Sequence, residues 1–202
     1  MVDQQIQRRG IVDERVLAAM TAVPRHRFVP SALSPRAYDD SPLPIGFDQT
    51  ISQPYVVAYM TEAAALPRDA VVLEIGTGSG YQAAVLAQIA AKVYSIEIVP
   101  ELAVRSRTLL DELGYDNIEV KAGDGYRGWP EEAPFDAILA TAAPDHIPPA
   151  LIEQLAIGAR LVIPVGRFQQ EMTIVTKTDD GATTQTTLPV RFVPMTGEAR
   201  QR

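Results

Sequence analysis

One segment of this 202-residue chain, Ala70–Gly80, constrains the fold more than any other. Its first part, Val71–Ile75, is nearly all apolar without alternation, which predicts a strand buried on both faces of a parallel sheet. Three glycines follow at alternate positions: Gly76, Gly78 and Gly80. Glycine lets a backbone turn sharply and approach a ligand closely. A helix predicted over residues 81–89 directs its positive N-terminal end at the same point. The segment therefore predicts a ligand-binding loop in an α/β protein.

The loop does not match the G-x-G-x-x-G fingerprint of dinucleotide-binding proteins, because Tyr81 stands where the third glycine belongs. Glu74 lies two residues before the first glycine, where its charge would repel a pyrophosphate. A carboxylate there favours a cofactor that is cationic nearby, and S-adenosylmethionine carries an ammonium and a sulfonium. Glu97, at the end of a strand predicted over residues 92–98, can accept hydrogen bonds from a ribose diol. The alternative is a doubly wound domain whose glycines only form a tight turn.

The E-x-G-x-G-x-G string resembles motif I of the class I methyltransferases. This resemblance implies that S-adenosylmethionine is the cofactor. Asp124 follows a strand predicted over residues 118–121, and the resemblance implies that its carboxylate accepts a hydrogen bond from the adenine amino group. A plain Gly-Asp-Gly turn is the alternative there. The predicted cofactor-binding residues are Glu74, Gly76, Thr77, Gly78, Ser79, Gly80, Glu97, Asp124 and Gly125.

Composition excludes several other classes of function. The net charge of −7 and the lack of a basic patch argue against nucleic acid as a partner. The absence of cysteine excludes disulfides and thiolate chemistry, and two histidines make a metal site improbable, so none is predicted. The polar N-terminus and the lack of an apolar run of roughly 20 residues predict no membrane segment and a cytoplasmic location. Nothing demands a dimer, so a monomer is expected.

Periodicity and turn residues predict a single domain over residues 1–202. A helix over 13–23 with Asp13 as N-cap, a proline-rich, extended and irregular stretch, and a helix over 54–66 form an N-terminal extension over 1–66. Strands and helices then alternate through a cofactor-binding core over 67–166, which predicts a doubly wound, mostly parallel Rossmann-like sheet. In the β-rich segment 167–202, two strands around Asp179–Gly181 predict an antiparallel hairpin.

A second resemblance concerns the substrate. Four segments carry it: PIGFDQTISQPYVVAYMT at 44–61, VPRHRFVP at 23–30, GDGYRGWPEEAPFDAI at 123–138 and LVIPVG at 161–166. Together they closely resemble the bacterial protein-L-isoaspartate O-methyltransferases over residues 6–197. Two positions depart from that pattern, because Asp48 and Ala159 stand where glycine is expected. The first departure could alter the flexibility of the substrate loop, and the second is expected to be neutral.

This resemblance implies methyl transfer to the α-carboxylate of L-isoaspartyl, or D-aspartyl, residues in damaged proteins and peptides, and repair through a succinimide. It assigns Ser52 to the active site and the loop of Thr50, Ile51, Ser52 and Gln53 to substrate binding. From the residues alone, Ser52 is better explained as the N-cap of the helix that begins at Pro54, and only the resemblance favours the substrate role. Two other functions stay open: a class I methyltransferase acting on another carboxylate, a small molecule or RNA, and a protein-binding module that retains affinity for the cofactor.

Other conspicuous residues have structural explanations. Arg25, His26 and Arg27 form a basic cluster that is expected to be a solvated helix end. Asp145-His146, before Pro148, predicts a helix entry rather than a catalytic histidine. Tyr81 and Trp129 are expected to pack in the core rather than form a substrate cage.

Overall fold

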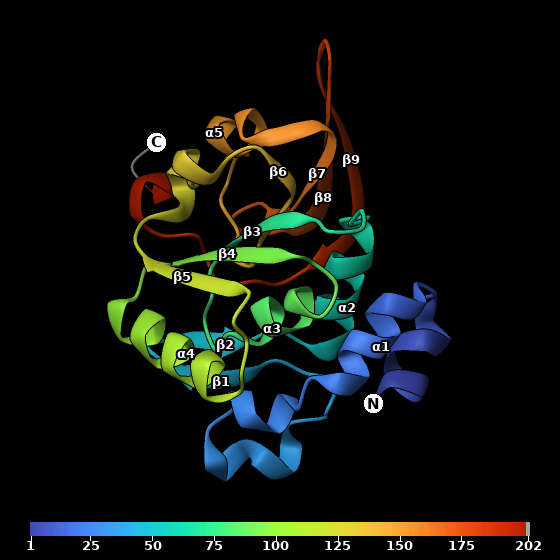
Figure 1. Cartoon of the computed structure of the whole chain (residues 1–202), viewed down its shortest axis with the longest axis vertical. Helices are drawn as coiled ribbons and strands as arrows, with labels where there is room; N and C mark the ends of the chain where they lie inside the picture. The colour runs from blue at the N-terminus through green and yellow to red at the C-terminus, as the bar shows by residue number, and fades with distance from the viewer. Residues whose placement is uncertain (201–202) are drawn as a thin grey trace.

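The computed structural model describes residues 1–200 and has a seven-stranded sheet at its centre (Figure 1). The strand order is β5-β4-β3-β6-β7-β8-β9. The strands from β5 to β7 in this order run parallel, and β8 and β9 add an antiparallel hairpin at one edge. In Figure 1 the tip of this hairpin projects beyond the rest of the molecule. The predicted doubly wound, mostly parallel sheet with a C-terminal hairpin is confirmed.

The elements follow the predicted order. The strands of the large sheet are β3 (Val71–Ile75), β4 (Lys92–Glu97), β5 (Ile118–Ala122), β6 (Phe135–Ala140), β7 (Leu155–Val165), β8 (Gln170–Thr178) and β9 (Gly181–Val190). The helices are α1 (Glu14–Ala22), α2 (Pro54–Ala63), α3 (Tyr81–Ala87), α4 (Pro100–Glu112) and α5 (Pro149–Glu153). Short helical turns are η1 (Val2–Ile6), η2 (Gln7–Arg9), η3 (Arg25–Phe28), η4 (Ser31–Arg36), η5 (Gly125–Arg127), η6 (Pro130–Glu132) and η7 (Gly197–Arg200). No helix within residues 1–200 is long and apolar enough to cross a membrane.

The central strand β3 is buried on both faces, as its nearly continuous apolar pattern predicts. Val72 belongs to a cluster with residues of α2 and α3 on one face. Leu73 and Ile75 belong to a cluster with Leu151 of α5 on the other face. Successive side chains of a strand point to opposite faces, so Glu74 lies on the same face as Val72. The chain leaves β3 first toward β4 and β5 and returns to β6 on the opposite side, so the switch point of the topology lies beside β3.

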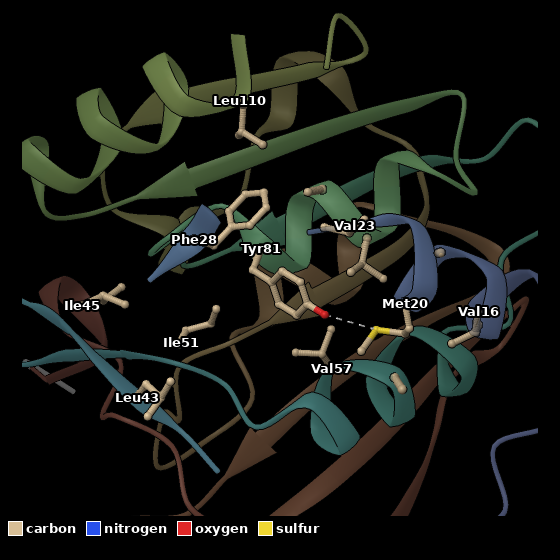
Figure 2. Packing of buried hydrophobic residues seen from close by; sticks show 14 of the residues in the cluster. Val16, Met20, Val23, Phe28, Leu43, Ile45, Ile51, Val57, Tyr81 and Leu110 are labelled. Atoms are coloured by element: carbon tan, nitrogen blue, oxygen red, sulfur yellow. Dashed lines mark hydrogen bonds between the residues drawn. The ribbon is translucent and has the colours of Figure 1, made fainter. Parts of the chain in front are cut away.

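The N-terminal extension packs around the residue that begins α3. Tyr81 is 1% exposed and lies among Met20 and Val23 from the α1 region, Phe28 of η3 and Val57 of α2 (Figure 2). Its hydroxyl donates to the Met20 sulfur at 3.9 Å, and its ring meets the Phe28 ring edge-on. Core packing of Tyr81 is thereby confirmed. Because Tyr81 directly follows the glycine loop, this packing ties the extension to that loop.

One expectation about the extension is partly right and another is wrong. The proline-rich stretch is irregular as expected, but it forms the 3-10 turns η3 and η4 instead of being extended throughout. Arg25 is not solvated but fully buried, with its guanidinium carbon 4.7 Å from the centroid of the Tyr81 ring. Its Nε donates to the Ala37 carbonyl at 2.7 Å, and burial lowers the pKa of its guanidinium. The sequence could not show this, because a basic cluster gives no sign of which member turns inward.

Strand β7 also begins earlier than predicted, at Leu155 rather than at residue 161. The pairing of β6 with β7 shifts register between Phe135 and Ala137, and the residues of β7 opposite this shift bulge outward. Gly158 and Arg160 interrupt the apolar pattern of this part of the sequence, on which the prediction depended, and Ile157 is 66% exposed. Ala159 lies in the strand with an ordinary negative φ, so its replacement of a glycine needs no strained backbone.

A small hairpin that the sequence did not predict holds the substrate-loop motif. Strands β1 (Leu43–Gly46) and β2 (Gln49–Ile51) pair antiparallel and are joined by Phe47 and Asp48. Both of these turn residues have a φ of 55°. Positive φ at both central residues is the geometry of a type I′ turn, which favours glycine at its second position. The departure from the family pattern at Asp48 therefore falls where an L side chain is strained.

Asp48→Gly is expected to raise the free energy of unfolding by about 0.5 kcal/mol, because it relieves left-handed strain at the cost of a more flexible unfolded chain. Urea unfolding of the two proteins measures the difference. Gly114→Ala, at a φ of +79° with open space around the added Cβ, is the converse control and should destabilise. A less stable Asp48→Gly variant would show that the Asp48 side chain stabilises the turn.

Candidate functional site

The glycine loop between β3 and α3 lies at the carboxyl ends of the parallel strands. Gly76, Gly78 and Gly80 all have positive φ, which L side chains rarely adopt. The Gly76 N–H donates to the Ile96 carbonyl at 2.7 Å, and a Cβ on Gly76 would lie 2.5 Å from Thr141 Oγ1. The loop therefore needs glycine both for its path and for its close contact with the segment after β6.

Glu97 at the end of β4 fixes the loop from the other side. Its carboxylate is buried and accepts the Gly78 N–H at 2.7 Å and the Val99 N–H at 2.9 Å. These bonds occupy one lone pair on each oxygen, and a carboxylate oxygen can accept a second bond. Glu97 is thus held in a fixed orientation at the edge of the loop, with acceptor capacity left for a diol.

Two cavities meet at the glycine loop and share Thr50, Gly76, Gly78 and Thr141. The first, here called the loop cavity, is lined by Gln49, Thr50, Ile75, Gly76, Gly78, Ile96, Glu97, Ile98, Asp124, Gly125, Thr141, Ala142, Val193, Pro194, Met195 and Thr196. The second, here called the Glu74 cavity, is lined by Thr50, Ile51, Ser52, Val57, Glu74, Gly76, Thr77, Gly78, Ser79, Tyr81, Gln82 and Thr141. The structure therefore brings together all the predicted cofactor residues except Gly80, which shapes the loop as the residue before α3.

The Glu74 carboxylate is completely buried and only partly hydrogen-bonded. The Ser95 hydroxyl donates to Oε2 at 2.5 Å and is itself 2.6 Å from the Thr77 hydroxyl. Within residues 1–200, Oε1 of Glu74 and Oε1 of Gln82 are buried without a hydrogen-bond partner. Burial raises the pKa of Glu74 to about 8. Two unsatisfied acceptors in one small cavity fit a donor with several N–H groups and a positive charge, such as an ammonium.

Asp124 lies at the far side of the loop cavity, where the chain turns from β5 into η5. Its Oδ1 accepts the Tyr126 N–H at 2.9 Å, and its Oδ2 accepts the Glu198 N–H at 2.8 Å. A Cβ on Gly125 would lie 2.4 Å from Ile75 Cγ2, so Gly125 brings the chain close against β3. The Gly-Asp-Gly segment is therefore both a turn and a wall of the cavity.

The sequence missed the C-terminal wall of the loop cavity. Val193 accepts the Ala143 N–H at 2.9 Å, and the Met195 N–H donates to the Ala143 carbonyl at 2.8 Å. These bonds hold residues 193–196 across the segment that follows β6. An isolated parallel β-bridge between Ala143 and Pro194 joins these residues, which are distant in sequence, and no short motif marks that pairing.

Ser52 lies where the Glu74 cavity meets a larger open cavity, here called the Ser52 groove. The groove has a volume of about 430 Å³ and is lined by Arg9, Pro42, Thr50, Ser52, Gln53, Tyr55, Val56, Thr141, Leu188, Pro189, Val190, Arg191, Phe192 and Val193. Of the predicted substrate loop, Thr50, Ser52 and Gln53 line this groove, whereas Ile51 lines only the Glu74 cavity and is buried. Ser52 thus borders both the cavity that fits an ammonium and the groove.

Ser52 is not the cap of α2. The N-cap is Gln53, and its side chain makes no capping bond. Asp40 satisfies the helix start instead, because its Oδ1 accepts the Tyr55 N–H at 3.1 Å. Its Oδ2 accepts from Gln53 Nε2 at 2.7 Å and from Arg9 Nη1 at 2.6 Å. The capping explanation of Ser52 therefore fails, because its hydroxyl does not cap this helix.

Replacing Asp40 by Ala is expected to lower the free energy of unfolding by about 1–2 kcal/mol, because the first turn of α2 loses its cap. Urea unfolding measures the loss. Asp39→Ala is the matched control, since Asp39 is exposed and its one ion pair among residues 1–200 is with Arg36 at 3.3 Å. Equal stability of the two variants would show that Asp40 does not cap the helix.

His146 belongs to a separate hydrogen-bonded chain. Its Nε2 lies 2.7 Å from the Tyr126 hydroxyl and its Nδ1 lies 2.6 Å from Asp145 Oδ1. The imidazole lines neither the two cavities nor the groove, in line with the expected non-catalytic role. Trp129 is 7% exposed and packs with Tyr94 in the core, as expected. Among residues 1–200 no group of three or more His, Cys, Asp or Glu side chains is placed to hold a metal ion.

Comparison with known proteins decides the family. A sequence model of the family described as protein-L-isoaspartate(D-aspartate) O-methyltransferase matches residues 1–200. The chain belongs to the protein-L-isoaspartate O-methyltransferase family. The protein-L-isoaspartate O-methyltransferase of Gloeobacter violaceus is 59% identical over 203 residues, covering 100% of this chain and 99% of that protein. The one from Picosynechococcus is 58% identical over 199 residues, covering 98% and 90%.

Solved structures agree with this membership. A protein-L-isoaspartate O-methyltransferase structure superposes with a TM-score of 0.89 at 28% identity, covering 98% of this chain and 67% of the other. A Plasmodium falciparum chain described as a member of the same family, in complex with S-adenosyl-L-homocysteine, gives a TM-score of 0.83 at 26% identity and covers 94% of both chains. The chain is therefore an S-adenosylmethionine-dependent methyltransferase that repairs L-isoaspartyl residues. This membership decides against a class I methyltransferase that acts on another carboxylate, a small molecule or RNA, and against a protein-binding module that only retains affinity for the cofactor.

Proposed function

We propose that the loop cavity and the Glu74 cavity together bind S-adenosylmethionine and that the Ser52 groove holds the isoaspartyl segment of the substrate. The observation that carries this proposal is that Ser52 and Thr141 border both the Glu74 cavity and the groove. A donor and an acceptor of a methyl group must meet at one point, and this is the border that the two spaces share. When bound, S-adenosylmethionine supplies an electrophilic methyl group for the substrate carboxylate.

Within the cofactor site, each residue is assigned to one part of the cofactor by its charge and its free hydrogen-bond acceptors. Oε1 of Glu74 and Oε1 of Gln82 face the ammonium, because both are buried acceptors without a partner among the described residues. Gln82 is held for this role by the bond from its Nε2 to the Thr61 hydroxyl at 2.9 Å. Glu97 accepts from the ribose diol, and Asp124 accepts from the adenine amino group with the lone pairs that backbone N–H groups leave free.

Ser52 positions the substrate and does not act as a base. A free α-carboxylate has a pKa near ~3.5 and is already ionised at neutral pH, so no proton needs to be removed. The Ser52 hydroxyl donates to one carboxylate oxygen and leaves the other free to react. Orientation of this kind can supply roughly 7–11 kcal/mol of a reaction barrier. A reaction between a carboxylate and a cation also loses charge, so the apolar walls of the groove, such as Val56 and Leu188, favour it by excluding water.

The activity on D-aspartyl residues, the oligomeric state, the location in the cell and the segment boundaries stay predictions. Activity on D-aspartyl residues follows from the family description and is testable with D-aspartyl peptides. The monomeric state and the cytoplasmic location rest on the sequence alone, and size-exclusion chromatography with light scattering, and cell fractionation, measure them. The boundaries of the three segments, 1–66, 67–166 and 167–202, are likewise a proposed division of one domain.

A crystal structure with S-adenosyl-L-homocysteine and an isoaspartyl peptide tests the assignment of residues. The expected result places the peptide carboxylate within hydrogen-bonding distance of Ser52 Oγ, and the cofactor amino group beside Glu74. A carboxylate bound elsewhere, with no contact to the loop of residues 50–53, would contradict the assignment even if the family activity holds.

A further inference from the structure

The Ser52 groove is larger than a single carboxylate requires. Its 430 Å³ are comparable to pockets that enclose whole small ligands, so the groove has room for residues next to an isoaspartyl residue. One wall comes from the start of α2 and the residue Arg9 of η2. The other comes from the end of β9 and the residues that follow it, up to Val193.

The charge of this groove is opposite to that of the whole protein. The chain carries a net charge of −7, yet none of the residues that line the groove is Asp or Glu, and two are arginines. Arg9 is already neutralised, because its Nη1 lies 2.6 Å from Asp40 Oδ2. Its guanidinium carbon also lies 3.4 Å from the centroid of the Tyr55 ring. Arg9 is therefore part of the wall rather than a free binding group.

Arg191 is the second arginine of the groove, and its positive charge is not neutralised by an ion pair within residues 1–200. It is exposed, and no ion pair joins it to another residue of the part of the chain that the structure describes. Its backbone is held on the C-terminal side, because the Phe192 N–H donates to Gln170 Oε1 at 2.6 Å and Gln170 Nε2 donates to the Phe192 carbonyl at 3.1 Å. A guanidinium on an anchored backbone is suited to recognise a carboxylate.

A group bound by Arg191 would be distinct from the reacting carboxylate. Arg191 lines the groove but neither the loop cavity nor the Glu74 cavity, whereas Ser52 and Thr141 line both the groove and the Glu74 cavity. A guanidinium bound to the reacting carboxylate would also withdraw its negative charge and weaken it as a nucleophile. We propose that Arg191 binds an acidic side chain flanking the isoaspartyl residue, so that the enzyme prefers substrates with Asp or Glu there over those with Lys or Arg.

This inference rests on the proposed function, and steady-state kinetics with three isoaspartyl peptides tests it. The peptides differ only at the residues on either side of the isoaspartate, which are Glu, Gln or Lys. The wild-type KM should rise from the Glu peptide through Gln to Lys, by about two- to fivefold per step at low salt. Raising the salt concentration should compress the series, because the charges are exposed.

Two variants make the test specific. Arg191→Gln should bring the three KM values together, mainly by raising that of the Glu peptide, while calorimetry shows unchanged affinity for S-adenosyl-L-homocysteine. Arg167→Gln removes an equal charge outside the groove and should keep the wild-type order. The inference is overturned if Arg191→Gln keeps the full KM series, or if it lowers kcat equally for all three peptides. Methylation of no peptide by the wild-type protein would instead overturn both this inference and the proposed function.

Discussion

Replacing Glu74 by Gln is expected to weaken cofactor binding by at least about 30-fold while the protein remains folded. The carboxylate is completely buried, and its Oε1 has no partner within residues 1–200. Removing one member of a buried, hydrogen-bonded charge pair costs about 2–5 kcal/mol. An amide keeps the size of the side chain and the contact with Ser95, but cannot neutralise an ammonium. Isothermal titration calorimetry with S-adenosyl-L-homocysteine measures the loss.

The same substitution has a second effect on the protein without cofactor. Burial raises the pKa of Glu74 to about 8 from a usual value of 4.5. Below pH 4.5 the carboxyl is protonated in the folded and the unfolded chain, and above it only the unfolded chain releases the proton. The protonated Glu74 therefore contributes fully to the stability of the folded protein below pH 4.5. This contribution is lost progressively as the pH rises from 4.5 through about 8. Glu74→Gln should match the wild type at pH 5 and exceed its stability at pH 9 by up to about 4 kcal/mol.

Glu119→Gln is the matched control for both effects. Glu119 lies on β5, has a 53% exposed side chain and pairs with Lys92 at 3.5 Å, so its loss should change neither cofactor affinity nor the pH dependence of unfolding. Unchanged affinity in Glu74→Gln would show that Glu74 does not face the cofactor. Equal unfolding free energies of Glu74→Gln and wild type at both pH 5 and pH 9 would show that burial does not raise the pKa of the Glu74 carboxyl.

Ser52→Ala is expected to lower kcat/KM for an isoaspartyl peptide by about 10- to 100-fold, since a hydrogen bond to a charged group contributes about 1.5–3 kcal/mol. Cofactor affinity and thermal stability should stay at wild-type values, because Gln53 is the N-cap of α2 and Asp40 satisfies the helix start. Steady-state kinetics, calorimetry and thermal unfolding measure the three quantities on one preparation.

Ser31→Ala, an exposed serine of the same N-terminal extension, is the control and should leave all three quantities unchanged. A lower melting temperature of Ser52→Ala with unchanged methyl transfer would restore the capping explanation. A parallel loss of cofactor affinity would instead place the Ser52 hydroxyl on the cofactor side of the shared border.

Much of the fold could be predicted because its signals are local. The nearly continuous apolar run Val71–Ile75, the glycines after it and the turn at Asp179–Gly181 each depend on neighbouring residues, and the structure has each where it was expected. The cofactor residues share this property, since they follow successive strands whose carboxyl ends meet at one edge. The sequence alone therefore predicts that Glu74, Glu97 and Asp124 lie at one site.

The parts that could not be predicted depend on contacts between distant segments. Arg25 turns inward because Tyr81 and the Ala37 carbonyl lie beside it. Asp40 caps α2 from outside that helix, and this contact removes the capping role that Ser52 has on sequence grounds. Residues 193–196 close the loop cavity through bonds to Ala143, and Arg191 joins the Ser52 groove by the same return of the chain. No spacing of residues within the sequence predicts these long-range contacts.

The most direct measurement of the central claim uses two synthetic peptides that differ in one residue, L-isoaspartate in one and L-aspartate in the other. Each is incubated with the protein and methyl-labelled S-adenosylmethionine, and base-labile label on the peptide is counted. Label on the isoaspartyl peptide alone is the predicted result. Label on neither peptide, with S-adenosyl-L-homocysteine binding intact, or equal label on both, would contradict the account of the Ser52 groove as an isoaspartyl site.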